Sequence, residues 1–494
     1  MKKLNYKLLD ASCLVASFIM FSASQSYAFV GEIFTIDDLD YTVRTESGTL
    51  RTVSVSSTDS ATSGDITIPS LVKNNGITYS VISIDDGAFD YCDSLTSIII
   101  PNGVTSIGDA AFSGCDSLVS VTIPDSVISI GENAFSGCER LSSVMIPDNV
   151  TFIGDCAFIS CGLTSVIIPD SVTFMGDAVF AGCIYLKSVT IGNGVTTIGQ
   201  QAFDGCDSLT SVTIPNSVTS IGSAAFFECD SLVSVTIPDS VVSMDNAFSY
   251  CDGLINVTIP DSVISMDCAF MGCSNLKNVM IGMKVTSMED AFNSCISLIE
   301  ISVNTENPAY CSIGGVLFNK SRTTLIQYPA GKKEKSYAIP DGVTSIEWLA
   351  FNMCKLKSIS IPASVNSIGK LAFEACEDLI NVYYHGNVPN AERMPYTARG
   401  IYSLTSEVLT SYYPEGNASW IAEIEKNDGQ WQERKTATWN PPPQTDTKIS
   451  YSYQKGIMTL AFTGTLQESN DALNWIPVPN VQDSYSVDTT KGKK

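Results

Sequence analysis

Cysteine is the chemically reactive residue that recurs most regularly in this sequence. The chain contains 16 cysteines, and twelve of them stand three positions after a phenylalanine, usually as Ala-Phe-x-x-Cys: Cys92, Cys115, Cys138, Cys161, Cys183, Cys206, Cys229, Cys251, Cys273, Cys295, Cys354 and Cys376. A free thiol packs as a small apolar group, so this column favours a buried ladder. Neighbouring coils about 5 Å apart would also allow occasional disulfides. The absence of Cys-x-x-Cys pairs and the near absence of histidine argue against zinc.

The single histidine limits the catalytic chemistry that the chain can perform. A Ser-His-Asp or Cys-His system would have to use His385, which lies in the segment that closes the repeats. We expect His385 to be a surface or turn residue. Nothing resembles a phosphate-binding loop or a dinucleotide-binding motif. The sequence therefore predicts no enzyme and no catalytic, cofactor-binding or metal-binding residue, and an enzyme site could lie only in the tryptophan-rich residues 400–440.

Carboxylates recur in two columns, and neither supplies the asymmetric pair that general acid–base catalysis needs. One column follows the proline of each repeat: Asn102, Asp125, Asp148, Asp170, Asn193, Asn216, Asp239 and Asp261. The other lies near a second bend: Asp86, Asp109, Glu132, Asp155 and Asp177. Calcium between coils is one interpretation, because calcium binds several oxygens. Asn replaces Asp freely and no glycine-rich metal loop is present, so we favour turn capping and solubility.

Serine and threonine alternate with apolar residues and form the candidate binding face. The residues that we expect to point outward are Ser120, Thr122, Ser188, Thr190, Ser211, Thr213, Ser234, Thr236, Asn256 and Thr258. A flat Ser-x-Thr array could bind a repetitive ligand such as a glycan, or even ice. Any strand that faces water has the same appearance, so both interpretations stay open.

These columns are positioned by a repeat of 22 or 23 residues, exemplified by LVSVTIPDSVISIGENAFSGCER at residues 118–140. Val121 and Ile123 share one face of a short strand, because side chains alternate along a strand. Pro124 ends the strand, since proline lacks the N–H of a sheet ladder.

The second half of the unit is expected to return the chain to the next strand. Gly131 should permit a tight bend, and Asn133 to Gly137 should form a single helical turn that carries Phe135 inward. One unit is too small to bury its own apolar face, so neighbouring units must stack.

The period and the motif IPDSVTSIGxxAFxxC resemble the BspA-like (treponemal-type) leucine-rich repeat surface proteins over residues 66–388. The predicted fold is a repeat solenoid: a leucine-rich repeat right-handed coil of about thirteen turns, mainly β with short helical turns. Residues 30–91 resemble that family's N-terminal cap, and residues 304–340 resemble its longer variant repeat. The resemblance implies a secreted or surface-displayed protein, often an adhesin that binds host proteins or other cells.

The net charge and the N-terminal residues indicate the class of partner and the cellular location of the protein. With 28 Lys and Arg against 52 Asp and Glu, the net charge is −24, which disfavours nucleic acid and anionic lipid as partners. Residues 1–28 have the pattern of a secretory signal peptide, with three lysines, an apolar stretch and the cleavage motif Ser26-Tyr27-Ala28. No later segment approaches the ~20 apolar residues of a membrane span.

The chain divides into five predicted parts: a signal peptide (1–28), an N-terminal cap with the first coil (29–91), the repeat array (92–390, with a variant repeat at 299–340), a closing segment with a proline-rich linker (391–444), and a small C-terminal β module (445–494). We interpret the protein as a monomeric, adhesin-like binder whose ligand is a protein or glycan on a host or neighbouring cell. The alternative is a structural envelope or surface spacer that is attached through its C-terminal module.

Overall fold

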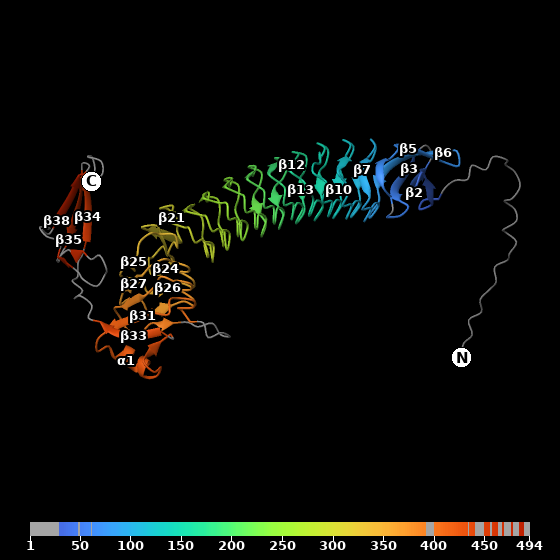
Figure 1. The fold of residues 1–494 in the computed structure, drawn as a ribbon. Helices are drawn as coiled ribbons and strands as arrows, with labels where there is room; N and C mark the ends of the chain where they lie inside the picture. Colours follow the sequence, from blue (N-terminus) through green and yellow to red (C-terminus); the bar gives the residue numbers. More distant parts are fainter. Residues whose placement is uncertain are drawn as a thin grey trace, which may run out of the picture.

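The structure, a computed structural model, describes residues 29–47, 50–60, 62–391, 400–432 and 434–439, and the backbone of five short strands between residues 449 and 488. The expected signal peptide and the proline-rich linker lie outside the described residues. Where it is described, the chain winds into a β-solenoid of about 15 turns (Figure 1). The expected number was thirteen, and the difference arises because strands continue beyond the last Ala-Phe-x-x-Cys motif.

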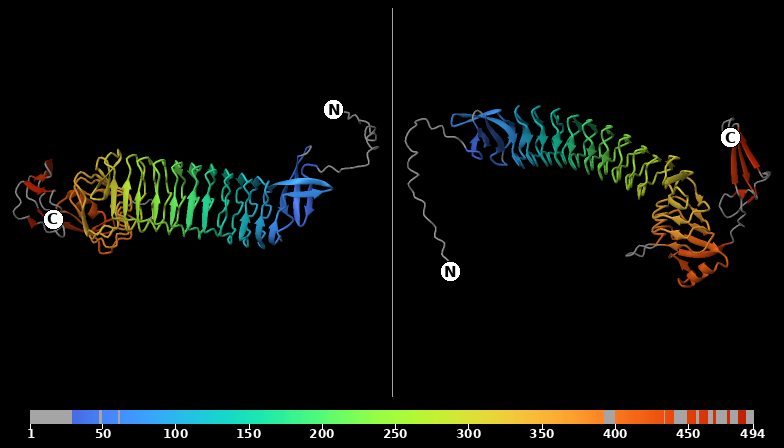
Figure 2. Two further views of the ribbon diagram at one scale, coloured as in Figure 1. Left: turned by 90° about the horizontal axis from the view of Figure 1, so that it is seen from above. Right: turned by 180° about the vertical axis from the view of Figure 1, so that it is seen from behind.

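One strand from most coils lies along one side of the solenoid, and we call this set of strands the front sheet (Figure 2). The strands form four hydrogen-bonded groups, and residues 141–147 of one coil form no strand. Most neighbours pair in parallel and in register, so Ser188 lies between Ser165 and Ser211. Its strands are β4 (Gly64–Thr67), β7 (Leu95–Ile99), β9 (Ser120–Thr122), β12 (Ser165–Ile168), β14 (Ser188–Ile191), β16 (Ser211–Thr213), β18 (Ser234–Thr236), β19 (Asn256–Thr258), β20 (Asn278–Ile281), β21 (Glu300–Val303), β25 (Ser336–Ala338), β27 (Ser358–Ile361), β29 (Asn381–Tyr384), β31 (Thr410–Pro414) and β33 (Arg434–Trp439).

A second set of shorter strands forms the back sheet. Three isolated bridges, between Ser220, Ser243, Ser265 and Ser287, continue it where no strand is long enough. Its strands are β8 (Ser106–Ile107), β10 (Ser129–Ile130), β11 (Phe152–Ile153), β13 (Phe174–Met175), β15 (Thr197–Ile198), β17 (Ser220–Ile221), β24 (Thr324–Gln327), β26 (Ser345–Ile346), β28 (Ser367–Ile368) and β30 (Asn390–Ala391).

The N-terminal end of the solenoid is covered by an antiparallel cap. Strand β2 pairs with β1 and β3, and β5 pairs with β6, which then joins the back sheet through β8. A solenoid needs such a cap because its terminal coil would otherwise expose an apolar face. The cap strands are β1 (Ile33–Ile36), β2 (Leu39–Ser47), β3 (Leu50–Ser57), β5 (Leu71–Asn74) and β6 (Ile77–Ile84).

The variant repeat interrupts the regular array. Strands β22 (Tyr310–Ile313) and β23 (Val316–Asn319) form a hairpin, and β23 pairs antiparallel with β24. The stack of coils changes direction beyond β21 (Figure 1). The buried apolar residues also separate here into two clusters, which meet at Val316 and Leu317.

At the C-terminal end, residues 400–439 pack against the last coil. Helix α1 (Ala418–Glu425) begins after Asn417, whose side chain accepts the backbone N–H groups of Ser419 and Trp420. Beyond it, β32 (Gln430–Trp431) pairs with β33. Among the strands described only by their backbone, β35 (Ile457–Phe462) pairs antiparallel with β34 (Ile449–Gln454) and β38 (Ser484–Asp488), and β36 (Gln467–Glu468) pairs with β37 (Ile476–Pro477).

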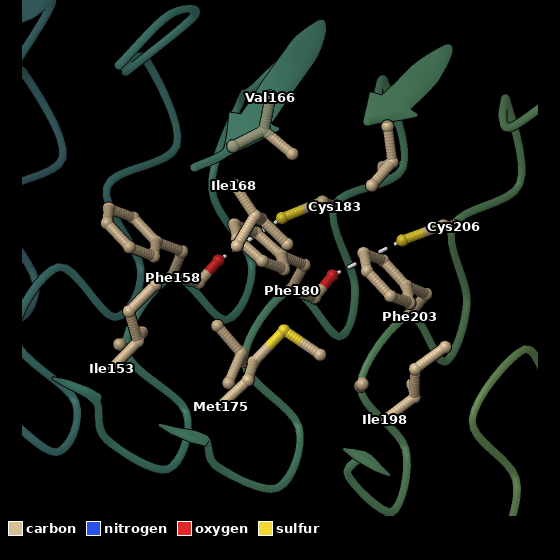
Figure 3. Packing of buried hydrophobic residues seen from close by; sticks show 14 of the residues in the cluster. Ile153, Phe158, Val166, Ile168, Met175, Phe180, Cys183, Ile198, Phe203 and Cys206 are labelled. Carbon is tan, nitrogen blue, oxygen red and sulfur yellow. Dashed lines mark hydrogen bonds between the residues drawn. The ribbon is translucent and has the colours of Figure 1, made fainter. Parts of the chain in front are cut away.

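The core is a ladder of phenylalanine rings, one from each regular coil. From Phe89 to Phe292 consecutive rings are stacked, and Phe203 lies with its centroid 5.5 Å from that of Phe180 and 5.2 Å from that of Phe226. Figure 3 shows this packing around Phe180. The predicted buried ladder is therefore present.

The segment that was expected to form a helical turn has a different conformation. In Asn133 to Gly137 both end residues have positive φ, 54° and 74°, and the N–H groups of Asn133, Phe135 and Gly137 donate to carbonyls of the next coil at 2.8 Å. A helix would direct these donors to its own preceding turn. The helical-turn prediction was wrong because the stacking of coils supplies better-placed acceptors.

Gly131 also serves a different purpose from the expected one. Its φ is not in the left-handed region. A Cβ atom at Gly131 would lie 2.7 Å from the backbone nitrogen of Asp109 in the preceding coil. Glycine is therefore required for close contact between coils, and not for backbone freedom.

We expect Phe203→Ala to lower the free energy of unfolding by about 3–5 kcal/mol, because the ring is fully buried between two others and its removal leaves a cavity. Denaturant unfolding of the purified chain measures this. Phe174→Ala is the control, since this ring is 49% exposed. Equal losses for the two variants would contradict the buried ladder.

Candidate binding surface

The front sheet presents the predicted candidate residues to solvent. All ten are exposed: Ser120, Thr122, Ser188, Thr190, Ser211, Thr213, Ser234, Thr236, Asn256 and Thr258. In-register pairing places Ser211 beside Ser234 and Thr213 beside Thr236, while Asn256 and Thr258 follow on β19. The intervening residues, such as Val212 and Val257, are buried. The strand alternation thus separates a polar surface from the core.

Large apolar side chains interrupt the threonine column. Met145 and Ile167 occupy neighbouring positions of this column and are 81% and 67% exposed. Ile99 and Met280 occupy the same position in other coils and are also exposed. These residues are absent from the predicted binding face, although they are visible in the sequence as departures from threonine at this position of the repeat.

The carboxylates of the second bend act as acceptors between coils. Asp109 Oδ1 accepts the backbone N–H of Glu132 at 2.8 Å, and Asp177 Oδ1 accepts that of Gln200 at 2.7 Å. Asp267 accepts the N–H of Glu289 in the same way. Each carboxylate therefore caps the turn of the following coil, as the capping interpretation requires. Among the described residues no group of three or more His, Cys, Asp or Glu is arranged to hold a metal ion.

The repeat cysteines lie inside the solenoid as free thiols. The Sγ–H of Cys183 donates to the carbonyl of Phe158 at 3.2 Å, and that of Cys206 donates to the carbonyl of Phe180 at 3.3 Å (Figure 3). Burial raises the pKa of the Cys183 thiol to about 12. A thiolate is the reactive form of cysteine, so these side chains serve packing and not nucleophilic chemistry.

His385 has a more specific environment than the expected surface or turn position. It is half-buried, its Nε2 lies 2.6 Å from Ser360 Oγ, and its ring packs edge-on against Trp439. Its buried Nδ1 has no hydrogen-bond partner among the described residues, so the acceptor that would orient a catalytic histidine is not in place. Burial lowers the pKa of His385, opposed by the nearby charge of Asp341.

The tryptophan-rich segment forms a hydrophobic cap on the last coil. Trp420 and Trp431 are buried, with centroids 5.0 Å apart, and both contact Tyr384. The indole Nε1 of Trp420 donates to the carbonyl of Gly386. These aromatic rings cover the last coil, which explains their density in the sequence.

Comparison with known proteins identifies the repeat. Residues 70–187, 175–299, 244–334 and 330–405 match the sequence model of the BspA type leucine rich repeat region, which comprises 6 copies. The chain belongs to this family. The predicted relationship is thereby confirmed, and so is the solenoid fold.

Solved structures of other bacterial leucine-rich repeat proteins resemble the chain. One from Bacteroides ovatus is 25% identical with a TM-score of 0.60, over 82% of this chain and 100% of that chain. A leucine rich cell surface protein from Faecalibacterium prausnitzii is 27% identical with a TM-score of 0.37, over 78% and 89% of the two chains. The leucine rich repeat protein of Treponema pallidum is 26% identical with a TM-score of 0.36, over 41% and 91%. No curated protein matches the chain.

The described part of this BspA-type chain includes one α-helix, α1, and no helix there has the length and apolar character needed to cross a membrane. The surface available for contacts therefore consists mainly of the two sheets and the turns that join them.

We expect Asp177→Ala to lower the free energy of unfolding by about 0.5–1.5 kcal/mol, because the N–H of Gln200 loses its acceptor. Asp177→Asn keeps an acceptor oxygen and should cost less. Thermal unfolding with and without calcium completes the test. A calcium-dependent rise in Tm that is lost in Asp177→Asn would instead support a metal between the coils.

Proposed function

We propose that this BspA-type protein is a secreted or cell-surface binding protein that engages a protein on a host or neighbouring cell through its front sheet. The exposed pair Met145 and Ile167 carries this proposal. Large apolar side chains on a water-facing surface lose favourable burial unless a partner covers them. Their place within the Ser/Thr columns gives the surface an apolar centre with a polar surround.

The chemistry of this surface favours a protein ligand over a purely repetitive glycan. Methionine adapts its shape to different apolar partners, and interface centres are enriched in such residues. The exposed hydroxyls of Ser188 and Thr190 and their neighbours can supply the hydrogen bonds of a surrounding rim. The parallel register keeps these groups flat and at fixed spacing, which limits the entropy lost on binding.

Substituting Met145→Thr and Ile167→Thr together tests the proposal, because both changes restore the residue most common in their column. We expect binding of the purified mature chain to target cells, or to a protein captured from them, to fall roughly tenfold. The free energy of unfolding should change little, since both side chains are exposed. Binding is measured by surface plasmon resonance or by flow cytometry.

The control variant carries Ile128→Thr and Ile264→Thr, which make the same kind of change at residues directly before Ser129 and Ser265 of the back sheet. These side chains are 49% and 45% exposed. Binding that falls equally in the two double variants would contradict a role specific to the front sheet. Wild-type binding in both would show that Met145 and Ile167 do not contribute.

A further inference from the structure

A half-open cleft lies where the variant repeat meets the regular coils. Its volume is about 490 Å³, and its lining comes from the coil before the hairpin, from the hairpin and from the coil after it. We call it the bend pocket and define it by Glu289, Asp290, Tyr310, Gln327, Glu347 and Trp348. None of these residues belongs to the candidate front-sheet surface.

The pocket exists because one contact between coils is missing. In the regular coil after it, a Cβ atom on Gly369 would lie 2.6 Å from the nitrogen of Trp348 in the preceding coil. Glu347 occupies the position that corresponds to Gly369, as the sequences IEWLAF and IGKLAF show. In the preceding coil, the residues beside Glu347 belong to strand β24 of the variant repeat and not to a regular turn. A long side chain and an open space therefore replace the usual close contact.

The floor of the pocket is apolar. Phe292 is the last ring of the first aromatic stack and lies 6.2 Å from Phe270, and a second stack begins with Tyr328 beside Phe351. Met288, Phe292 and Leu317 are buried and line the cleft between these two stacks. Trp348 also lines the cleft and is 39% exposed. An occupant would thus find apolar contacts and an accessible indole.

The rim of the pocket is acidic. Asp290 accepts one hydrogen bond from Asn293 Nδ2 at 2.7 Å, and burial, aided by the charges of Glu289 and Asp267, raises its pKa. In the described part of the chain, the ion pairs do not include Glu289, Asp290 or Glu347.

One candidate for an internal cation is Lys370. It lines a neighbouring hollow together with Glu347 and Trp348. No ion pair joins it to Glu347 within the described residues. Within the described residues, no ion pair therefore neutralises the carboxylates of the bend pocket.

We propose that the bend pocket binds the guanidinium group of an arginine side chain presented by a partner polypeptide. Guanidinium is planar, donates hydrogen bonds in a fork that suits carboxylates, and stacks on aromatic rings. An indole provides the strongest such ring contact. The methylene groups of the arginine side chain can contact the apolar floor. Residues 29–300 carry nearly all of the net negative charge of the protein. This charge attracts a basic partner to the coils on the N-terminal side of the bend pocket.

A labelled peptide tests the proposal directly. The probe is Gly-Gly-Gly-Arg-Gly-Gly-Gly with an uncharged dye, and its partner is the same peptide with citrulline, which keeps the shape but loses the charge. Fluorescence anisotropy with the full mature chain should show at least about tenfold tighter binding of the arginine peptide. Glu347→Gln and Trp348→Ala should each reduce that affinity about fivefold or more, without changing the circular dichroism spectrum.

Two control variants separate a specific pocket from general attraction to an acidic protein. Glu377→Gln removes one exposed carboxylate elsewhere in the C-terminal coils and should leave the affinity unchanged. Lys370→Ala removes the neighbouring cation and should maintain or increase the affinity. Equal affinities for the arginine and citrulline peptides would overturn the proposal, as would equal losses in Glu347→Gln and Glu377→Gln. Because the front sheet is intact in all of these variants, cell binding through it would be unaffected by either result.

Discussion

The structure depends on the requirement that each coil stack in register on the next. The hydrogen bonds to the phenylalanine carbonyl show this constraint most clearly. The carbonyl of Phe180 accepts the N–H of Cys183 in its own coil and the Sγ–H of Cys206 in the next coil. The side chain at the cysteine position must therefore be small enough for the interior, apolar and a weak hydrogen-bond donor, which a thiol satisfies. The same register aligns the aromatic rings inside and the Ser/Thr columns outside. The surface pattern is thus a consequence of the core.

Departures from the repeat become informative because the repeat is so strict. On the front side of the solenoid the departure adds apolar side chains at Met145, in a coil that forms no strand, and at Ile167, in β12, which pairs in register with β14. At the variant repeat the departure inserts the hairpin of β22 and β23, divides the core and leaves the acidic bend pocket. At the C-terminal end, Trp420 and Trp431 replace the missing next coil. One array therefore offers two surfaces of different chemistry on different sides of the solenoid.

The sequence predicts the parts of this structure that the period encodes. The Phe and Cys columns, the exposed Ser/Thr positions and the stacked coils follow from spacing alone. Asn133 to Gly137 could not be predicted correctly, because the partners of their N–H groups lie in another coil. The same reason explains Gly131, whose role is visible only once Asp109 is placed against it. The contact between His385 and Ser360 and the space beside Glu347 likewise depend on how particular coils meet, which spacing does not specify.

Within each stack of coils an interior ladder of rings and thiols fixes the surface columns, and the accessibility of individual cysteines tests this relation most directly. The folded mature chain is treated with iodoacetamide near pH 8, and the labelling of each cysteine is measured by mass spectrometry before and after denaturation. We predict that Cys183 and Cys206 remain unlabelled in the folded chain and react only after unfolding. The half-buried Cys156 and Cys268 should react slowly in the folded chain. Labelling of Cys183 and Cys206 in the folded chain at the rate of Cys156 would contradict it.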